Sequence, residues 1–358
     1  MRFETELIAL GRERKLTAYT GMTLLKIILT WTQEVAAGVE LVEEKKEGGL
    51  VSSPKLSVAA SGYSGRGYSD LFGLNEGKTL MSITTALAAE DKPGIRAWER
   101  MQISAFAVTH VEEIAAKDVE VGYRYLQAVP RFLTPQKHDE LDYEVDLWNS
   151  AEYALNEAAN AGNYIHNYIE DYFNDNFPES PAREDHYQMV EAFHAWESEH
   201  DIEVIANERT VYGPQYAGTA DFFAKVDGVV SLIDWKSSRN IQTSHKAQLA
   251  AIGAATTTAR EVAKDTPGAI KHKLQPKVSE EYGGQEFAWF VEEPLPDFQQ
   301  YAVVQIRPGD TGKYGEWIEP FCEMHVIPQK QIDAGWSIFQ ACRDLRLAQK
   351  QMKEAERG

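Results

Sequence analysis

The spacing of apolar residues changes from helical to alternating in the middle of the chain, and this change predicts the order of the main elements. A helical period predicts two helices, and alternating stretches separated by Gly-Pro and Asp-Gly turns predict three strands after them. A further helix and a further strand follow. The order helix, strands, helix and strand predicts an α/β core. The predicted helices cover about 147–173, 183–200 and 244–261, and the predicted strands cover 202–212, 216–226, 229–235 and 300–307.

The flanking regions are predicted to add helices to this core. Helical spacing marks 20–38 and about 93–116, and the chain ends with a strand near 317–326 and a helix from Pro328. Between the first two helices, a charge run and a Gly/Ser-rich stretch over 40–68 are typical of loops and short hairpins. We therefore expect an N-terminal extension over 1–75 and a second, larger domain over 76–358.

The composition fits a soluble globular protein, because 43% of the 358 residues are hydrophobic and 25% are charged. A formal net charge of −19 argues against broad adhesion to nucleic acid or to anionic membranes. Residues 137–207 hold 18 acidic and only 2 basic side chains, which we interpret as solvated helix faces turned away from any DNA. The other segments together carry nearly equal numbers of acidic and basic side chains, so they can still form a local basic groove.

Only two cysteines occur, Cys322 and Cys342. This number excludes a disulfide framework, a four-cysteine zinc site and a cysteine-ligated iron–sulfur cluster, and it favours a reducing cytoplasm. The most apolar stretch, 22–31, is short and interrupted by Lys26, so we expect neither a signal peptide nor a membrane span.

The most informative stretch is YAGTADFFAKVDGVVSLIDWKSS, residues 216–238. On two adjacent antiparallel strands, Asp221 and Asp234 can face the same side, and alternation places Lys236 beside Asp234. Two carboxylates and an amine inside apolar strands are costly to bury without a cation or a mutual network. Oxygen-rich sites of this kind suit Mg²⁺ or Mn²⁺. The alternative is a purely structural ion pair between Asp234 and Lys236.

These residues resemble a known family. Gly218-Thr-Ala-Asp221, followed by Asp234-Trp-Lys236, is similar to the core motif of the PD-(D/E)XK nucleases, in the branch of RecB-type domains, CRISPR-associated nucleases and phage exonucleases. AANAGNYIHNYIEDYF resembles the helix that carries a metal-binding histidine in that branch. Gln248 resembles the start of its Gln-x-x-x-Tyr motif, with Ile252 in place of the tyrosine. The motifs span 160–252, and 82–98 resembles an N-terminal segment of phage members.

The resemblance implies a PD-(D/E)XK restriction-endonuclease-like fold, a mixed sheet flanked by helices, with a divalent-metal site. In it, Lys236 orients or deprotonates the attacking water, and Gln248 orients a ligand or a phosphate. Arg239 and Lys246 are the better candidates for DNA contact, whereas the basic helix face of Lys92, Arg96 and Arg100 is equally well a solvated face. The implied ligands of Mg²⁺ or Mn²⁺ are His166, Asp221, Asp234, the backbone carbonyl of Trp235 and Glu208.

Two of these ligands have a structural alternative. Taken alone, His166 is better interpreted as a helical histidine packed beneath the sheet. The downstream motif with Asp221, Asp234 and Lys236 favours a metal ligand instead. Glu208 is equally well a solvated glutamate at a strand end. Ile252 lacks the tyrosine hydroxyl, which removes any DNA contact made by that group.

The implied activity is that of a metal-dependent deoxyribonuclease, an exonuclease of phage replication or recombination. Its expected partner is linear DNA with free or single-stranded ends, with a phage recombination protein and self-association as further partners. The alternative function is a catalytically silent DNA-end-binding or recombination-partner module on the same fold. Intact His166, Asp221, Asp234 and Lys236 favour the enzyme.

Overall fold

The computed structural model describes residues 56–59, 66–74, 76–77, 79–90, 93–109, 150–176, 178–275, 279, 284–311 and 316–356. These residues form two compact units, one from the described parts of 1–90 and 165–358 and one from those of 91–164. The predicted helix over 20–38 lies outside the described residues.

The smaller unit contains helix α4 (Pro93–Thr109) and the first part of helix α8 (Ser150–Phe173). α4 begins at a proline, a residue that suits the first turn of a helix because the amide hydrogen it lacks has no partner there. The prediction of a helix from residue 93 is confirmed as far as Thr109, and 110–116 lie outside the described residues. The predicted helix over about 147–173 is confirmed as α8.

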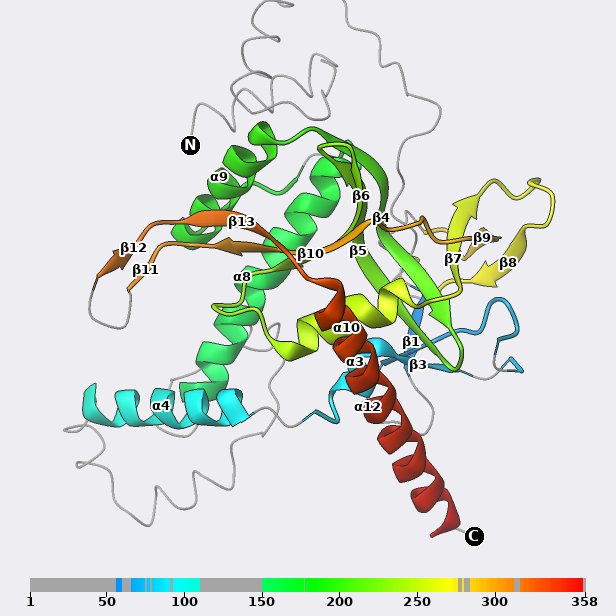
Figure 1. The fold of residues 1–358 in the computed structure, drawn as a ribbon, viewed down its shortest axis with the longest axis horizontal. Helices are drawn as coiled ribbons and strands as arrows, with labels where there is room; N and C mark the ends of the chain where they lie inside the picture. Colours follow the sequence, from blue (N-terminus) through cyan, green and yellow to red (C-terminus); the bar gives the residue numbers. More distant parts are fainter. Residues whose placement is uncertain are drawn as a thin grey trace, which may run out of the picture. The chain divides into compact units, whose positions relative to one another are not determined.

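The larger unit is built on a mixed sheet (Figure 1). Its centre is an antiparallel meander of β4 (Ile202–Gly213), β5 (Tyr216–Val226) and β6 (Val229–Lys236), which confirms the three predicted strands. In the β5–β6 turn, Asp227 and Gly228 have φ values of 50° and 86°, as a tight hairpin with two left-handed residues requires. Next to β6, β10 (Gln300–Arg307) runs parallel, and β13 (Phe321–Val326) pairs antiparallel with β10.

The meander is extended on both sides. The start of β5 pairs with β3 (Leu80–Ser82), which continues into β2 (Arg66–Tyr68) and β1 (Ser57–Ala59). β1 and β2 precede residue 75 and still belong to this sheet, and the division of the chain at residue 75 stays a prediction. On the other side the order is β4, β7 (Thr257–Val262), β9 (Phe287–Glu293) and β8 (Ile270–Lys273).

Two sequence predictions need correction. The helix expected over 244–261 is α10 (Thr243–Gly253), and it ends before β7. β-branched residues at 256–258 favour a strand there, and pairing with β4 and β9 completes it. The strand expected over 317–326 is divided by Pro320 into β12 (Trp317–Ile318) and β13, and β12 pairs instead with β11 (Asp310–Thr311). The final helix, α12 (Gln329–Ala355), begins after Pro328 as predicted.

Helices cover both faces of the sheet in this unit (Figure 1). α10, α12 and the short α3 (Ile83–Leu87) enclose one core with Phe223, Leu232 and Val303. On the opposite face, the end of α8 and α9 (Glu184–Glu199) contribute an aromatic layer. The architecture is therefore α/β, as the pattern predicts. The aromatic layer consists of Phe173, Phe193, Trp196, Phe222 and Trp235.

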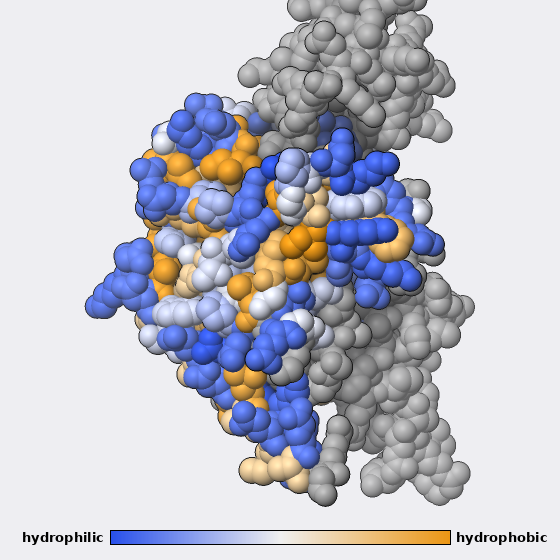
Figure 2. All heavy atoms as spheres, turned by 90° about the vertical axis from the view of Figure 1, so that its right-hand side faces the viewer, coloured by the Kyte–Doolittle hydropathy of each residue, from blue (hydrophilic) through white to orange (hydrophobic). Residues whose placement is uncertain are grey.

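The surface on the side of β7–β9 mixes hydrophobic patches with hydrophilic side chains, as Figure 2 shows. In the part of the chain that the structure describes, no helix combines the length and apolar character needed to cross a lipid bilayer.

Candidate metal and catalytic site

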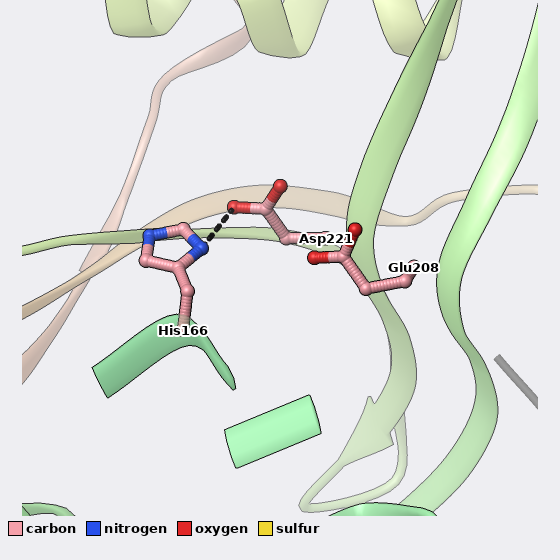
Figure 3. A group of neighbouring side chains, drawn as sticks. All are labelled: His166, Glu208 and Asp221. Carbon is pink, nitrogen blue, oxygen red and sulfur yellow. Dashed lines mark ion pairs between the residues drawn. The ribbon is translucent and has the colours of Figure 1, made fainter. Parts of the chain in front are cut away.

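Three potential metal ligands from separate elements meet at one point of the larger unit (Figure 3). His166 comes from α8, Glu208 from β4 and Asp221 from β5, and one ligand atom of each lies within 4.8 Å of the others. His166 Nδ1 is 3.7 Å from Asp221 Oδ2. His166 keeps 27% of its side chain exposed, so the group is open to solvent.

Local structure explains how these three side chains converge. Phe173 packs on Phe222 with ring centroids 4.6 Å apart, and His166 lies seven residues, about two helical turns, before it on the same face of α8. On the sheet, the pairs Asn207↔Phe222 and Arg209↔Ala220 set Glu208 opposite Asp221. The helix and the strand pair thus aim their side chains at one place.

Glu208 has an unusual backbone conformation. Its φ is +47°, and among the described residues no other non-glycine residue inside a strand has a positive φ. Such a conformation is strained for a residue with a side chain, at a cost of roughly 1 kcal/mol or more. This conformation interrupts the regular strand geometry of β4 next to the site. Sequence periodicity cannot predict such a position.

Asp234 and Lys236 of β6 lie beside this group. Lys236 Nζ is 2.7 Å from Asp234 Oδ1 and 3.9 Å from Asp221 Oδ2. The last pair of the β5–β6 ladder at this end is Phe222↔Ile233. Beyond it, the Trp235 backbone N–H donates to Asp221 Oδ2 (3.1 Å), and Lys236 Nζ donates to the Trp235 carbonyl (3.1 Å). We call His166, Glu208, Asp221, Asp234 and Lys236 the charged cluster.

Burial and charge set the protonation of this cluster. Asp234 is 1% exposed, and burial raises its pKa to about 7, although the Lys236 ammonium opposes the shift and Asp221 adds to it. For Lys236, burial acts to lower the pKa, but the carboxylates of Asp234 and Asp221 outweigh it and the pKa is raised. Lys236 is therefore positively charged at neutral pH.

The donor set fits a hard divalent cation. One imidazole nitrogen with carboxylate oxygens suits Mg²⁺ or Mn²⁺, and no thiolate belongs to this group of described residues. Among the expected ligands, the structure brings His166, Glu208 and Asp221 together. Asp234 lies next to them but is paired with Lys236, and the Trp235 carbonyl accepts a hydrogen bond from Lys236.

The other predicted site residues lie apart from these contacts. Gln248 is half-buried on α10, and its side chain forms no hydrogen bond or ion pair with the residues that the structure describes. Lys246 is half-buried on the same helix. Arg96 and Arg100 are exposed on α4, and Lys92 lies outside the described residues.

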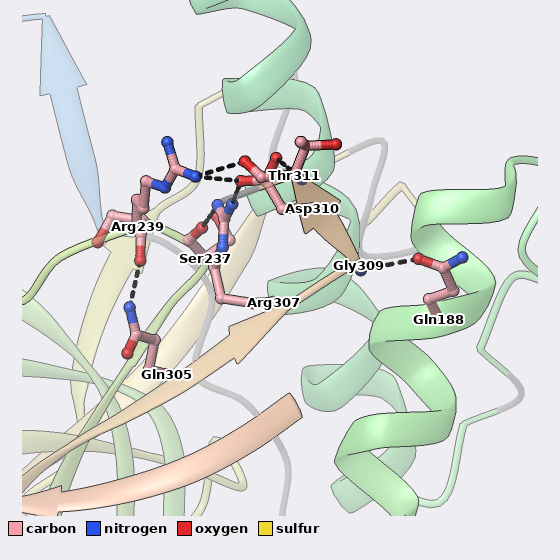
Figure 4. Close-up of polar contacts among 9 residues, drawn as sticks. Gln188, Ser237, Arg239, Gln305, Arg307, Gly309, Asp310 and Thr311 are labelled. Carbon is pink, nitrogen blue, oxygen red and sulfur yellow. Dashed lines mark hydrogen bonds and ion pairs between the residues drawn. The ribbon is translucent and has the colours of Figure 1, made fainter. Parts of the chain in front are cut away.

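Arg239 belongs to a polar network around the segment that follows Lys236 (Figure 4). Its guanidinium donates to the Thr311 carbonyl (2.9 Å) and lies 3.4 Å from Asp310 Oδ2. Arg307 donates to the Ser237 carbonyl (2.8 Å) and to Asp310 (2.9 Å), and Gln305 donates to the Ser238 carbonyl (2.6 Å). β10 therefore fixes the backbone directly after the charged cluster. Sequence reasoning missed Gln305 and Arg307, whose only signal is that they are polar residues at the end of an apolar strand.

Comparison of the sequence with protein-family models and with curated proteins finds no match. The chemistry of the site is therefore inferred from its own side chains.

Proposed function

We propose that the protein is a metal-dependent DNA nuclease, an exonuclease that hydrolyses phosphodiester bonds from DNA ends. One observation carries the proposal: three metal-ligand side chains converge within 4.8 Å, and the ion pair between the buried Asp234 and the half-buried Lys236 adjoins them. Carboxylates and imidazole around a divalent ion, with a lysine beside them, form a site suited to a phosphate ester and an attacking water.

The topology supports the resemblance to the PD-(D/E)XK nucleases. Helix α8, the antiparallel meander β4–β6, helix α10 and the parallel strand β10 occur in this order along the chain, with α9 before the meander and β7–β9 before β10. Asp221 stands on β5, and Asp234 and Lys236 stand on β6; these are the residues that resemble the family motif. Ile252, which replaces the tyrosine of the resembled motif, lies on α10 after the meander and is only 1% exposed.

Each side chain has a role in this mechanism. His166, Glu208 and Asp221 would hold the ion, with Asp234 as a further carboxylate. A bound divalent ion polarises the phosphate and lowers the pKa of a water molecule. Lys236, held charged by its two carboxylate neighbours, stabilises negative charge that develops on the phosphate and orients the water through its N–H groups. Asp221 also accepts the Trp235 N–H, so it fixes the hairpin end that carries Lys236.

The charge distribution favours action at DNA ends. A net charge of −19 disfavours the coating of long duplexes, so productive contacts are confined to a short region near the cluster. Such a role suits phage replication or recombination. The end-binding module without catalysis shares these contacts and differs only in turnover.

The proposal is tested by incubating end-labelled linear DNA and covalently closed circles with the full-length protein in Mg²⁺, Mn²⁺ or EDTA. We expect metal-dependent loss of the end label from linear DNA and little nicking of circles. Asp221→Asn abolishes the activity, whereas the matched control Asp265→Asn, in an exposed turn, retains it. Binding of ends without hydrolysis under all conditions would support the silent module, and equal nicking of circles would identify an endonuclease.

A further inference from the structure

The strands β7, β9 and β8 carry a basic and aromatic surface on one face. Pairing sets Lys271 beside Trp289 and Lys273 beside Phe287, and Val262 lies on the other side of Trp289. Because side chains directly opposite each other share a face, these residues form one surface. The opposite face is buried in a core that contains Ala259, Leu274, Ala288 and Phe290.

The positive charges on this surface are exposed, whereas its acidic residue is paired. Lys271, Lys273 and Arg260 are all exposed. Glu293 lies on the same face, but Arg260 Nε and Arg209 both bind its carboxylate. Glu261 pairs in register with Phe290, so it belongs to the opposite face. In a protein of net charge −19, this surface is therefore locally positive.

The two aromatic rings of this surface are in contact with a cation. Lys271 Nζ lies 3.8 Å from the centroid of Phe287 and 5.8 Å from that of Trp289. Both rings are only half-buried, although they stand on a sheet with a complete core on its other face. Aromatic rings beside lysines on an open sheet suit unstacked bases and their phosphates, and a duplex offers no such unstacked bases to the rings.

Ion pairs of Glu293 with Arg260 and Arg209 connect this surface to strand β4, which also carries Glu208 of the proposed active site. Arg209 follows Glu208 directly on β4, and its guanidinium lies 3.6 Å from Glu293 Oε2. From β4 to β8 there are three strand spacings of about 4.8 Å, or about 14 Å in all. That distance is within the span of a single-strand site of about 4 to 16 nucleotides.

We infer that the face of Lys271, Lys273, Phe287 and Trp289 binds single-stranded DNA that leads to or from the charged cluster. The inference rests on the proposed function, because it supplies the strand that the nuclease acts on. Lys271 and Lys273 neutralise phosphates, and Trp289 and Phe287 stack with bases.

Binding is measured by fluorescence anisotropy with the full-length protein, a labelled oligothymidylate of about 20 nucleotides and EDTA, so that no cleavage occurs. The double variant Lys271→Glu, Lys273→Glu is expected to weaken binding at least about tenfold and to reduce its salt dependence. Trp289→Ala is expected to weaken binding about tenfold. The control Lys330→Glu, an exposed charge reversal on α12, changes it less than about twofold.

The outcomes separate this inference from the proposed function. Unchanged single-strand binding by the double lysine variant would overturn the inference, even if the wild-type protein cleaves DNA. A loss confined to duplex binding would also overturn it. Wild-type protein that binds the oligothymidylate through these lysines but never hydrolyses DNA would leave the surface in place and reject the nuclease. The lysine variants are exposed substitutions, so they test the surface even if Trp289→Ala fails to fold.

Discussion

Strands β5 and β6 carry two regions of opposite character on adjacent residues. Phe222 and Trp235 belong to the aromatic layer beneath α8 and α9, with the rings of Phe193 and Trp235 6.1 Å apart. Asp221 directly precedes Phe222 and Asp234 directly precedes Trp235, yet both aspartates belong to the charged cluster. Aromatic burial lowers the free energy of the folded state, whereas burial of a carboxylate raises it unless a partner is present. The aromatic layer therefore stabilises the two strands, whereas the charged cluster is costly to bury and is the part to which we assign the proposed chemistry.

The sharpest test of this division is Lys236→Ala. We expect a loss of about a thousandfold in hydrolysis, since the charge facing the developing phosphate charge disappears. Single-strand binding in EDTA and the fold should be retained, because Asp234, with its raised pKa, can take up a proton in place of its partner. The measurement is single-turnover cleavage of end-labelled DNA beside circular dichroism. Wild-type turnover in the variant would remove Lys236 from the mechanism.

The complementary test removes an aromatic ring. Phe193 is fully buried and contacts Tyr172, Phe173 and Trp235. Phe193→Ala is expected to lower the free energy of unfolding by about 3 to 5 kcal/mol, measured by urea titration. Where the variant remains folded, its rate of hydrolysis should stay near the wild-type value. A large loss of activity in folded protein would show that the two regions are not separate.

The aromatic layer also predicts a dependence of stability on pH. His194 contacts Tyr168, Tyr172 and Phe193, and burial lowers its pKa to about 4. Its Nδ1 is buried without a hydrogen-bond partner among the described residues, so a second N–H would have no acceptor. The unfolded chain binds this proton near pH 6.5 and the folded chain does not. The contribution of neutral His194 to the free energy of unfolding is therefore fully present above pH 6.5. It falls by about 2 to 3 kcal/mol as the pH drops to 4.

Urea titrations between pH 4 and pH 7 check this slope. His194→Gln keeps a side-chain amide that can hydrogen-bond to the Tyr168 hydroxyl, whose oxygen lies 2.9 Å from His194 Nε2, but it cannot take up a proton. We expect a flatter pH profile for this variant. An identical slope in both proteins would assign the effect to other groups.

The smallest expected effect lies at the far end of the same two strands. Gly228 in the β5–β6 turn has a φ of +86°, and a Cβ there would meet nothing within 4 Å. Gly228→Ala is therefore expected to cost about 1 kcal/mol through backbone strain alone. Thermal unfolding should detect this loss, and hydrolysis should not change. Altered cleavage would mean that the turn and the charged cluster are coupled along the hairpin.

Sequence patterns predicted the central strands because their signals are local. Alternation and the Asp227-Gly228 turn defined β5 and β6, and the same strands carried Asp221, Asp234 and Lys236. The placement of His166 could be predicted from resemblance alone, because packing of α8 on the sheet decides it. The positive φ of Glu208 could not be predicted because it departs from regular strand geometry, and the network of Arg307 could not be predicted because it joins distant segments. β7 was missed because its apolar residues continue a helical pattern from α10.

The hydrogen bond from the Trp235 backbone to Asp221 also protects against register slippage. A shift of β6 by one residue would turn Asp234 and Lys236 to the aromatic face and Trp235 to the charged one. It would also remove the Trp235 N–H from the carboxylate that now accepts it. β10, in parallel register with β6 from Gln300↔Ser231 to Gln305↔Lys236, would lose its alignment at the same time. A hairpin that bears charge on one side and tryptophan on the other thus has one low-energy alignment, and misfolded alternatives with the strands displaced are disfavoured from the start.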